Sequence, residues 1–134
     1  MAAEPVLCMK DISKSYYGTQ VLDNVSLTIM PGEVHGIVGE NGAGKSTLMN
    51  ILFGMSVIHS TGGFDGSIEI DGRAVEIKSP LQAMSLGIGM VHQEFMLLPN
   101  YTVAENIKLN REVLRPNLLS RIFGPKLQSL NHQK

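Results

Sequence analysis

The sequence predicts an α/β fold in which a glycine-rich loop connects a strand to a helix. The apolar run Val34-His35-Gly36-Ile37-Val38 reads as a strand and leads directly into the loop, Gly39-Glu40-Asn41-Gly42-Ala43-Gly44-Lys45-Ser46-Thr47. Apolar residues then recur at the spacing of one helix face, at Leu48, Ile51, Leu52 and Met55. Alternating segments on both sides of this unit predict a small antiparallel sheet, around 6–29 and 68–77, beside a parallel core.

The glycine-rich loop is suited to binding phosphate groups, because it matches the pattern G-x-x-x-x-G-K-[ST] without a mismatch. Gly39, Gly42 and Gly44 allow positive φ angles and close approach of a ligand to the backbone. The backbone N–H groups and the start of the next helix then favour phosphate oxygens. Lys45 supplies a cation for the terminal phosphates, and the Ser46 hydroxyl is placed to bind Mg²⁺. The loop therefore predicts nucleotide binding, the alternative being a flexible turn without a ligand.

The composition is that of an ordinary globular domain. The chain has 134 residues, 43% of them apolar and 17% charged, which is enough for one hydrophobic core. A net charge of −1 gives no support for a nucleic-acid or membrane-surface footprint. The single cysteine, Cys8, suits a reducing compartment. No signal-peptide pattern is evident, and the longest apolar stretch, 48–58, is too short to span a bilayer, so a cytoplasmic location is expected.

Two strands are expected ahead of the loop. Residues 6–9 read as the first strand, followed by a polar run through Lys14. Tyr16-Tyr17-Gly18 predicts a turn, residues 25–29 alternate like a half-buried strand, and Pro31-Gly32 predicts another turn.

Behind the loop and its helix, residues 56–66 show no periodicity and predict a connecting loop. Residues 67–70 and 74–77 alternate on either side of Asp71-Gly72, which is a strong hairpin signal. Ser79 and Pro80 are a good N-cap and first residue for a short helix over 81–86, which Gly87 ends.

A buried strand is expected over 88–91, followed by one more helix. Thr102 and Glu105 form a capping box for that helix, which includes Val103, Ile107 and Leu109.

The segment 110–134 differs from the rest of the chain in its charge and composition. It carries five basic residues against the single acidic Glu112, and Pro116 and Pro125 interrupt any long helix. It reads either as an amphipathic segment that binds a membrane or partner, or as part of a larger domain; the second interpretation is favoured.

Taken together, the motifs resemble the ATP-binding subunit of ABC transporters over roughly residues 6–108. Lys14-Ser15-Tyr16-Tyr17-Gly18-Thr19-Gln20-Val21-Leu22 resembles the family's A-loop. The resemblance implies that Tyr16, or alternatively Tyr17, stacks on adenine and that Val21 packs beside the base. All nine residues of the loop 39–47 would bind ATP.

Downstream, Val91-His92-Gln93-Glu94 resembles the family's Q-loop. The resemblance implies that Gln93 reaches Mg²⁺ and the attacking water. Lys45 and Gln93 would then be the catalytic residues, and Ser46 and Gln93 the metal-binding ones.

The resemblance implies a P-loop NTPase fold, with 1–109 as part of a nucleotide-binding domain and 110–134 as the start of a helical subdomain. The sequence around the loop is most similar to importers of monosaccharides such as ribose and galactose, with nucleoside importers as the nearest alternative. Permease subunits, a substrate-binding protein and a second ATPase domain would be partners, on the inner face of the cell membrane. No nucleic acid partner is expected.

ATP hydrolysis in this family also needs a Walker B strand, a signature motif and a switch histidine, and none of them is recognisable here. The expectation is a domain truncated after the Q-loop, as a shortened polypeptide or the product of an interrupted gene. Such a chain would bind ATP–Mg²⁺ without turning it over by itself. The sequence is also compatible with a non-catalytic remnant or with a DNA-repair or chromosome ATPase. The A-loop aromatic and the lack of a basic stripe favour transport over a DNA-repair or chromosome role.

Overall fold

The computed structural model describes residues 4–92, 97–109, 114–115 and 129–130, which belong to two compact units, 1–91 and 92–134. The elements of the first unit are β1 (Leu7–Tyr16), β2 (Thr19–Ile29), α1 (Lys45–Leu52), α2 (Ser56–Ser60), β3 (Asp65–Ile70), β4 (Arg73–Val75) and α3 (Pro80–Ser85). Those described in the second unit are α4 (Val103–Lys108), β5 (Leu114–Arg115) and β6 (Ser129–Leu130).

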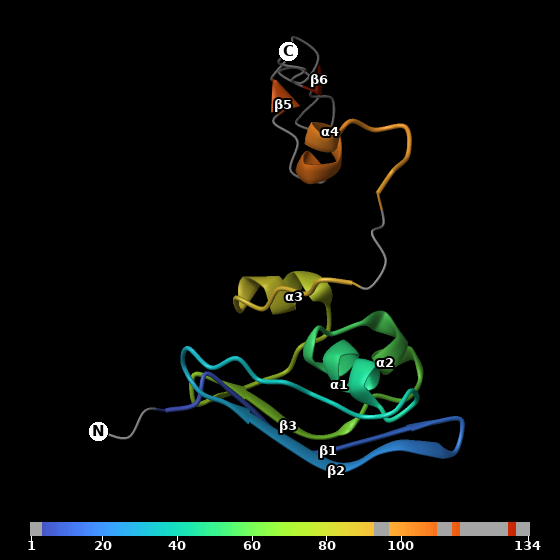
Figure 1. The fold of residues 1–134 in the computed structure, drawn as a ribbon, viewed down its shortest axis with the longest axis vertical. Helices are drawn as coiled ribbons and strands as arrows, with labels where there is room; N and C mark the ends of the chain where they lie inside the picture. Colours follow the sequence, from blue (N-terminus) through green and yellow to red (C-terminus); the bar gives the residue numbers. More distant parts are fainter. Residues whose placement is uncertain (1–3, 93–96, 110–113, 116–128, 131–134) are drawn as a thin grey trace, which may run out of the picture. The chain divides into compact units, whose positions relative to one another are not determined.

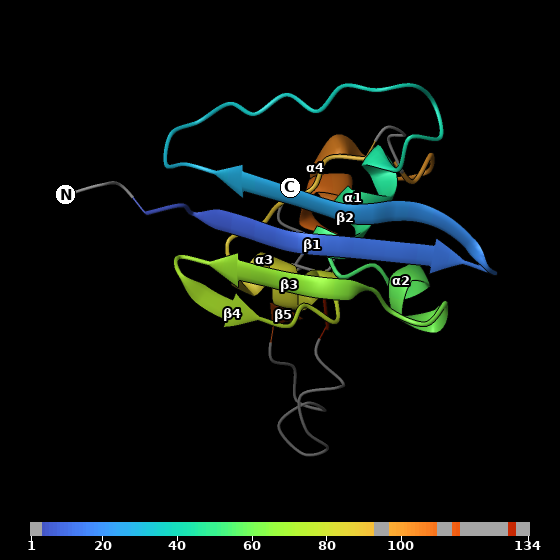
Figure 2. The ribbon, with the colours of Figure 1, turned by 90° about the horizontal axis from the view of Figure 1, so that it is seen from below.

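The first unit is built on a four-stranded antiparallel sheet with the order β2-β1-β3-β4. Figure 2 shows the four strands side by side, and Figure 1 shows α1 and α2 over one face of the sheet. The core lies between these layers. It contains buried strand residues such as Met9, Ile12 and Ile68 and buried helix residues such as Ile51 and Ile58.

The turn predicted at Tyr16-Tyr17-Gly18 and the hairpin turn predicted at Asp71-Gly72 both form, each between two paired strands. Tyr17 and Gly18 have φ angles of 50° and 85°, and Asp71 and Gly72 have φ angles of 48° and 71°. Two consecutive positive φ angles are characteristic of a two-residue hairpin loop of type I′. The turns therefore fix how β1 pairs with β2 and how β3 pairs with β4.

Strand β1 extends well beyond the predicted segment 6–9, through the run that reads as polar. The pairing of β1 with both neighbours shifts register after Met9, and Asp11 has a φ of 51°, so the strand contains a bulge. The bulge changes which residues face inward. Leu7 and Met9 are buried before it, and Ile12 and Lys14 are buried after it.

The predicted caps of the two short helices are confirmed. The Ser79 hydroxyl accepts a hydrogen bond from the Gln82 N–H at 3.3 Å, and Pro80 is the first residue of α3. Thr102 and Glu105 form the capping box of α4. Gly87 follows α3 with a φ of 84°, as a helix-ending glycine does.

Two predicted strands of the parallel core are wrong. Residues 33–40 and 88–92 have no regular secondary structure, and Val34 and Val38 are 99% and 94% exposed. A parallel strand forms only where neighbouring strands pair with it and cover its faces. Among the described residues no strand pairs with either segment.

The predicted loop 56–66 is also wrong in part, because it contains α2 and the first residues of β3. Ile58 is fully buried in the core and fixes this short helix against the sheet. One buried residue is too little to produce a helical periodicity in the sequence.

Candidate phosphate-binding site

The loop 39–47 combines local backbone geometry with a close contact to β2. Gly42 and Gly44 have φ angles of 88° and 85°, which favour glycine, whereas Gly39, contrary to expectation, does not adopt a positive φ. A Cβ atom on Gly44 would lie 2.6 Å from Leu22 Cδ2 and 2.9 Å from the Val21 carbonyl oxygen. The backbone of the loop therefore rests on β2 at a point where neighbouring atoms sterically exclude a side chain.

Lys45 directs its ammonium group back over the loop. Its Nζ donates hydrogen bonds to the carbonyl oxygens of Gly39 and Glu40, both at 2.7 Å. The loop is further closed by the Ala43 N–H, which donates to the Glu40 carbonyl oxygen at 3.2 Å. The result is a compact turn with one positive charge at its centre.

The helix that follows places the predicted metal ligand. Gly44 is the N-cap of α1, and its carbonyl oxygen accepts from the Leu48 N–H at 2.9 Å. Ser46 therefore lies in the first turn of the helix, and it is exposed. Buried Leu48 and Ile51 hold the helix on the sheet, so the loop is attached to a packed element.

These residues fit the phosphate chain of ATP with Mg²⁺. Gly44 has no side chain that could cover the backbone of the loop, and neighbouring atoms leave no room for one. Lys45 provides the cation, and the Ser46 hydroxyl is an oxygen ligand of the kind Mg²⁺ prefers. Within the described part of the chain, no group of three or more His, Cys, Asp or Glu side chains could hold a metal by itself. Mg²⁺ would be bound through the Ser46 hydroxyl together with phosphate oxygens, as in phosphate-loop sites generally.

The turn leading into the loop is fixed by Glu33. Its carboxylate accepts from the Met30 N–H at 2.7 Å and contacts His35 Nδ1 at 2.7 Å. The hydrogen bond from Met30, and then that with His35, lowers the pKa of Glu33. The carboxylate is thus held in its charged form in the turn.

The two candidate adenine residues lie at the β1–β2 hairpin. Tyr16 is the last residue of β1 and is half-buried against the core, whereas Tyr17 is 96% exposed in the turn. Val21, on β2, is half-buried next to Leu22, and its carbonyl oxygen is one of the atoms nearest to Gly44. The structure therefore brings Val21 to the phosphate loop.

Gln93, the predicted Q-loop residue, lies outside the described residues. Its neighbours Val91 and His92 are described and exposed. Most of the tail 110–134 also lies outside them, and of it only the paired β5 and β6 are described.

One residue that the sequence did not single out is Lys14. It is a buried lysine whose ammonium lies over the Tyr16 ring, 4.7 Å from its centroid. The local sequence gives no signal for it, because its burial follows from the bulge in β1 described above.

Comparison with known proteins identifies the family. A family model described as ABC transporter matches residues 22–132, which is most of the chain. The chain belongs to the ABC transporter family. The predicted P-loop NTPase fold is thereby confirmed, although two strands of its parallel core are not formed in this structure.

The chain is also similar to ATP-binding proteins of import systems. It is 51% identical to the ribose import ATP-binding protein RbsA 1 of Burkholderia cenocepacia (strain HI2424) over 84% of this chain and 21% of that protein. It is 49% identical to the glucose import ATP-binding protein TsgD13 of Haloferax volcanii over 87% of this chain and 20% of the relative. The guanosine import ATP-binding protein NupO of Bacillus subtilis is 50% identical over 81% of this chain and 20% of the relative. The chain thus spans about a fifth of the length of these relatives.

Two solved structures have a similar fold. A bacterial Atm1-family ABC exporter with ATP bound matches with a TM-score of 0.64 and 26% identity, over 86% of this chain and 19% of the exporter chain. The cbiO1 protein of Clostridium perfringens, part of the ABC transporter complex cbiONQ, matches with a TM-score of 0.50 and 29% identity. That match covers 63% of this chain and 32% of cbiO1. Among the described helices, none has the length and apolar character that crossing a membrane demands.

Proposed function

We propose that this chain holds ATP with Mg²⁺ as part of the ATPase subunit of an ABC importer. The observation that carries the proposal is the loop 39–47, in which Lys45 Nζ is fixed by the carbonyl oxygens of Gly39 and Glu40 at 2.7 Å. The proposal is supported by membership of the ABC transporter family and by the similarity to import ATP-binding proteins.

Each part of the nucleotide has a proposed set of contacts. Lys45 neutralises charge on the terminal phosphates, the remaining residues of the loop 39–47 hold the phosphate chain, and Ser46 binds Mg²⁺. Tyr16 stacks on the adenine and Val21 packs beside it. Gln93 completes the metal site and orients the attacking water.

The transported substrate is proposed to be a monosaccharide. The ribose and glucose import relatives support this class, and the guanosine import relative supports a nucleoside as the alternative at nearly the same identity. Permease subunits, a substrate-binding protein and a second ATPase domain would be the partners, at the cytoplasmic face of the membrane. Substrate selectivity would reside in these partners.

The 134-residue chain by itself is proposed to bind ATP–Mg²⁺ without sustained hydrolysis. Its sequence contains no recognisable Walker B or signature motif. Phosphoryl transfer needs a positioned water and electrostatic stabilisation of the transferring group, to which these motifs contribute.

The melting temperature of the purified chain tests the binding proposal. Saturating ATP–Mg²⁺ should raise it, since a ligand at a hundredfold excess over its Kd stabilises the folded state by about 2.7 kcal/mol. Lys45→Ala should abolish the shift. Lys78→Ala is the matched control, because Lys78 is exposed and its ammonium forms an exposed ion pair with Glu76 at 3.0 Å.

The outcomes separate the competing functions. No shift with millimolar ATP–Mg²⁺ in the unaltered chain would reject nucleotide binding and favour a structural remnant. Phosphate release that Lys45→Ala abolishes would reject binding without turnover.

A further inference from the structure

Lys14 occupies a core position on β1. It is 3% exposed and lies on the inward face between buried Ile12 and half-buried Tyr16. Burial lowers the pKa of Lys14, because the charged ammonium loses contact with water. An apolar side chain would occupy this position without the free-energy cost of burying a charge, which indicates that the lysine has a specific role.

The ammonium group of Lys14 connects two elements. It donates hydrogen bonds to the carbonyl oxygens of Thr61 at 2.9 Å and Ile58 at 3.3 Å, at the end of α2. Both carbonyls lie at the C-terminal end of α2, and that of Ile58 also accepts from the Gly63 N–H at 2.9 Å, so the ammonium joins a closed helix end. The same Nζ lies 4.7 Å from the centroid of the Tyr16 ring, within range of a cation–π interaction.

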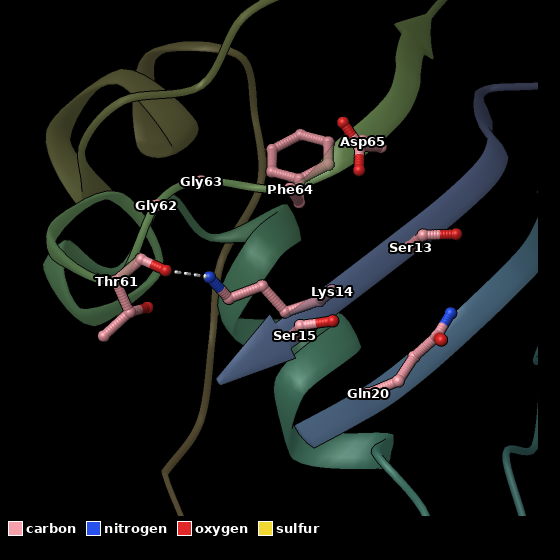
Figure 3. A pocket seen from close by; sticks show the side chains of 9 residues that line it. All are labelled: Ser13, Lys14, Ser15, Gln20, Thr61, Gly62, Gly63, Phe64 and Asp65. Carbon is pink, nitrogen blue, oxygen red and sulfur yellow. Dashed lines mark hydrogen bonds between the residues drawn. The ribbon is translucent and has the colours of Figure 1, made fainter. Parts of the chain in front are cut away.

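Figure 3 shows how Lys14 reaches from its strand to Thr61. A hollow of about 240 Å³ opens beside it, lined by residues 13–15 of β1, by Gln20 of β2 and by residues 61–65, which lead from α2 into β3. None of the residues lining the hollow belongs to the loop 39–47, so it is separate from the phosphate site. The hollow also leaves space for a substituted side chain at position 14.

We propose that Lys14 is a positioning residue that holds the Tyr16 ring in the orientation for stacking on adenine. Tyr16 is the last residue of its strand, packs against the core and precedes the exposed Tyr17. The Lys14 ammonium, itself fixed to the end of α2, is a further fixed group beside the ring. This inference deepens the proposed function and rests on it.

Binding of ATP compared with inorganic tripolyphosphate tests the inference. Both ligands are titrated with Mg²⁺ into the purified chain by calorimetry. Lys14→Met should weaken ATP binding about five- to tenfold, because it should remove part of the affinity that base–aromatic stacking contributes. Binding of tripolyphosphate, which has no base, should be unchanged. In the Tyr16→Ala background the same substitution should cause no further loss, because the two residues act on one contact.

Lys10→Met is the matched control. Lys10 lies on the same strand before the bulge, is exposed, and pairs with Glu69 at 2.7 Å, so ATP binding should be unchanged. An equal loss of both ligands in Lys14→Met would overturn the inference. So would unchanged ATP binding with a lower melting temperature, which indicates a structural role alone.

A measurement on the unaltered chain avoids any folding defect of the variants. ATP, but not tripolyphosphate, should shift the NMR signals of the Tyr16 ring and of the Lys14 side chain. ATP binding with no change at Lys14 would overturn the inference alone. Failure to bind either ligand would overturn both this inference and the proposed function.

Discussion

At the scale of single residues, Gly44 is where the phosphate loop meets the sheet. Two observations explain why this residue is glycine. Its φ of 85° is a backbone conformation that favours glycine, and a Cβ atom would clash with Val21 and Leu22. The motif alone predicts the first reason. The second depends on β2, which lies about twenty residues earlier in the sequence.

Gly44→Ala should therefore destabilise the fold by about 2–4 kcal/mol, through left-handed strain and overpacking together. Gly42→Ala is the control, because Gly42 has a similar φ of 88° but no atom lies within 4 Å of an added Cβ. It should cost about 1 kcal/mol. Urea unfolding measures both variants, and equal midpoints would contradict the role of the β2 contact.

Lys14 and Tyr16 also show that the local sequence predicts only part of a residue's surroundings. The motif singles out Tyr16, and nothing in the neighbouring residues marks Lys14 as buried. Its position inside the core is decided by the bulge at Asp11, which is a property of the strand.

At the scale of elements, the bulge in β1 is matched by a glycine on β3. Gly66 has a φ of 106°, and a Cβ atom there would lie 2.5 Å from the Lys10 carbonyl oxygen and 2.7 Å from that of Asp11. The Asp11 N–H is bound from the other side by the Ser26 hydroxyl at 3.0 Å. The bulge is therefore held by both neighbouring strands.

Gly66→Ala should disrupt this arrangement and lower the free energy of unfolding by about 2–4 kcal/mol. Because the bulge turns Lys14 and Tyr16 inward, ATP binding should weaken as well. Gly62→Ala, with a φ of 93° and open space around its Cβ, is the control and should cost only about 1 kcal/mol. Urea unfolding and ATP titration measure the two effects. A Gly66→Ala variant as stable as Gly62→Ala would be incompatible with a bulge held by close contact.

At the scale of the whole molecule, the first unit exposes apolar side chains where a parallel core was expected. Val34, Val38 and Val91 are 99%, 94% and 92% exposed. Extended apolar segments with open backbone groups readily associate with other chains.

The purified chain should therefore self-associate as its concentration rises, which light scattering measures. Replacing Val34 and Val38 with threonine should reduce the association, because it removes apolar surface and keeps a similar shape. Val57→Thr, at a less exposed position on α2, should leave it unchanged. A monodisperse monomer at all concentrations would contradict this prediction.

The sequence by itself determined those features that depend only on residues close to one another in the chain. The phosphate-binding motif, the turn at Asp71-Gly72 and the cap at Ser79-Pro80 each depend on side chains and φ preferences of their immediate neighbours. For the same reason this motif, together with the segments around Tyr16 and Gln93, indicated the family.

Only the tertiary structure decided which residues face the core beyond Asp11, that a short helix forms around Ile58, and that residues 34–38 do not form a strand. These features depend on pairing and burial between segments far apart in the sequence. A bulge reverses the alternation of a strand, and a parallel strand exists only beside its partners. The glycine-rich loop is therefore recognisable in the sequence, whereas its support by β2 and the contact of Lys14 with Tyr16 are visible only in the fold.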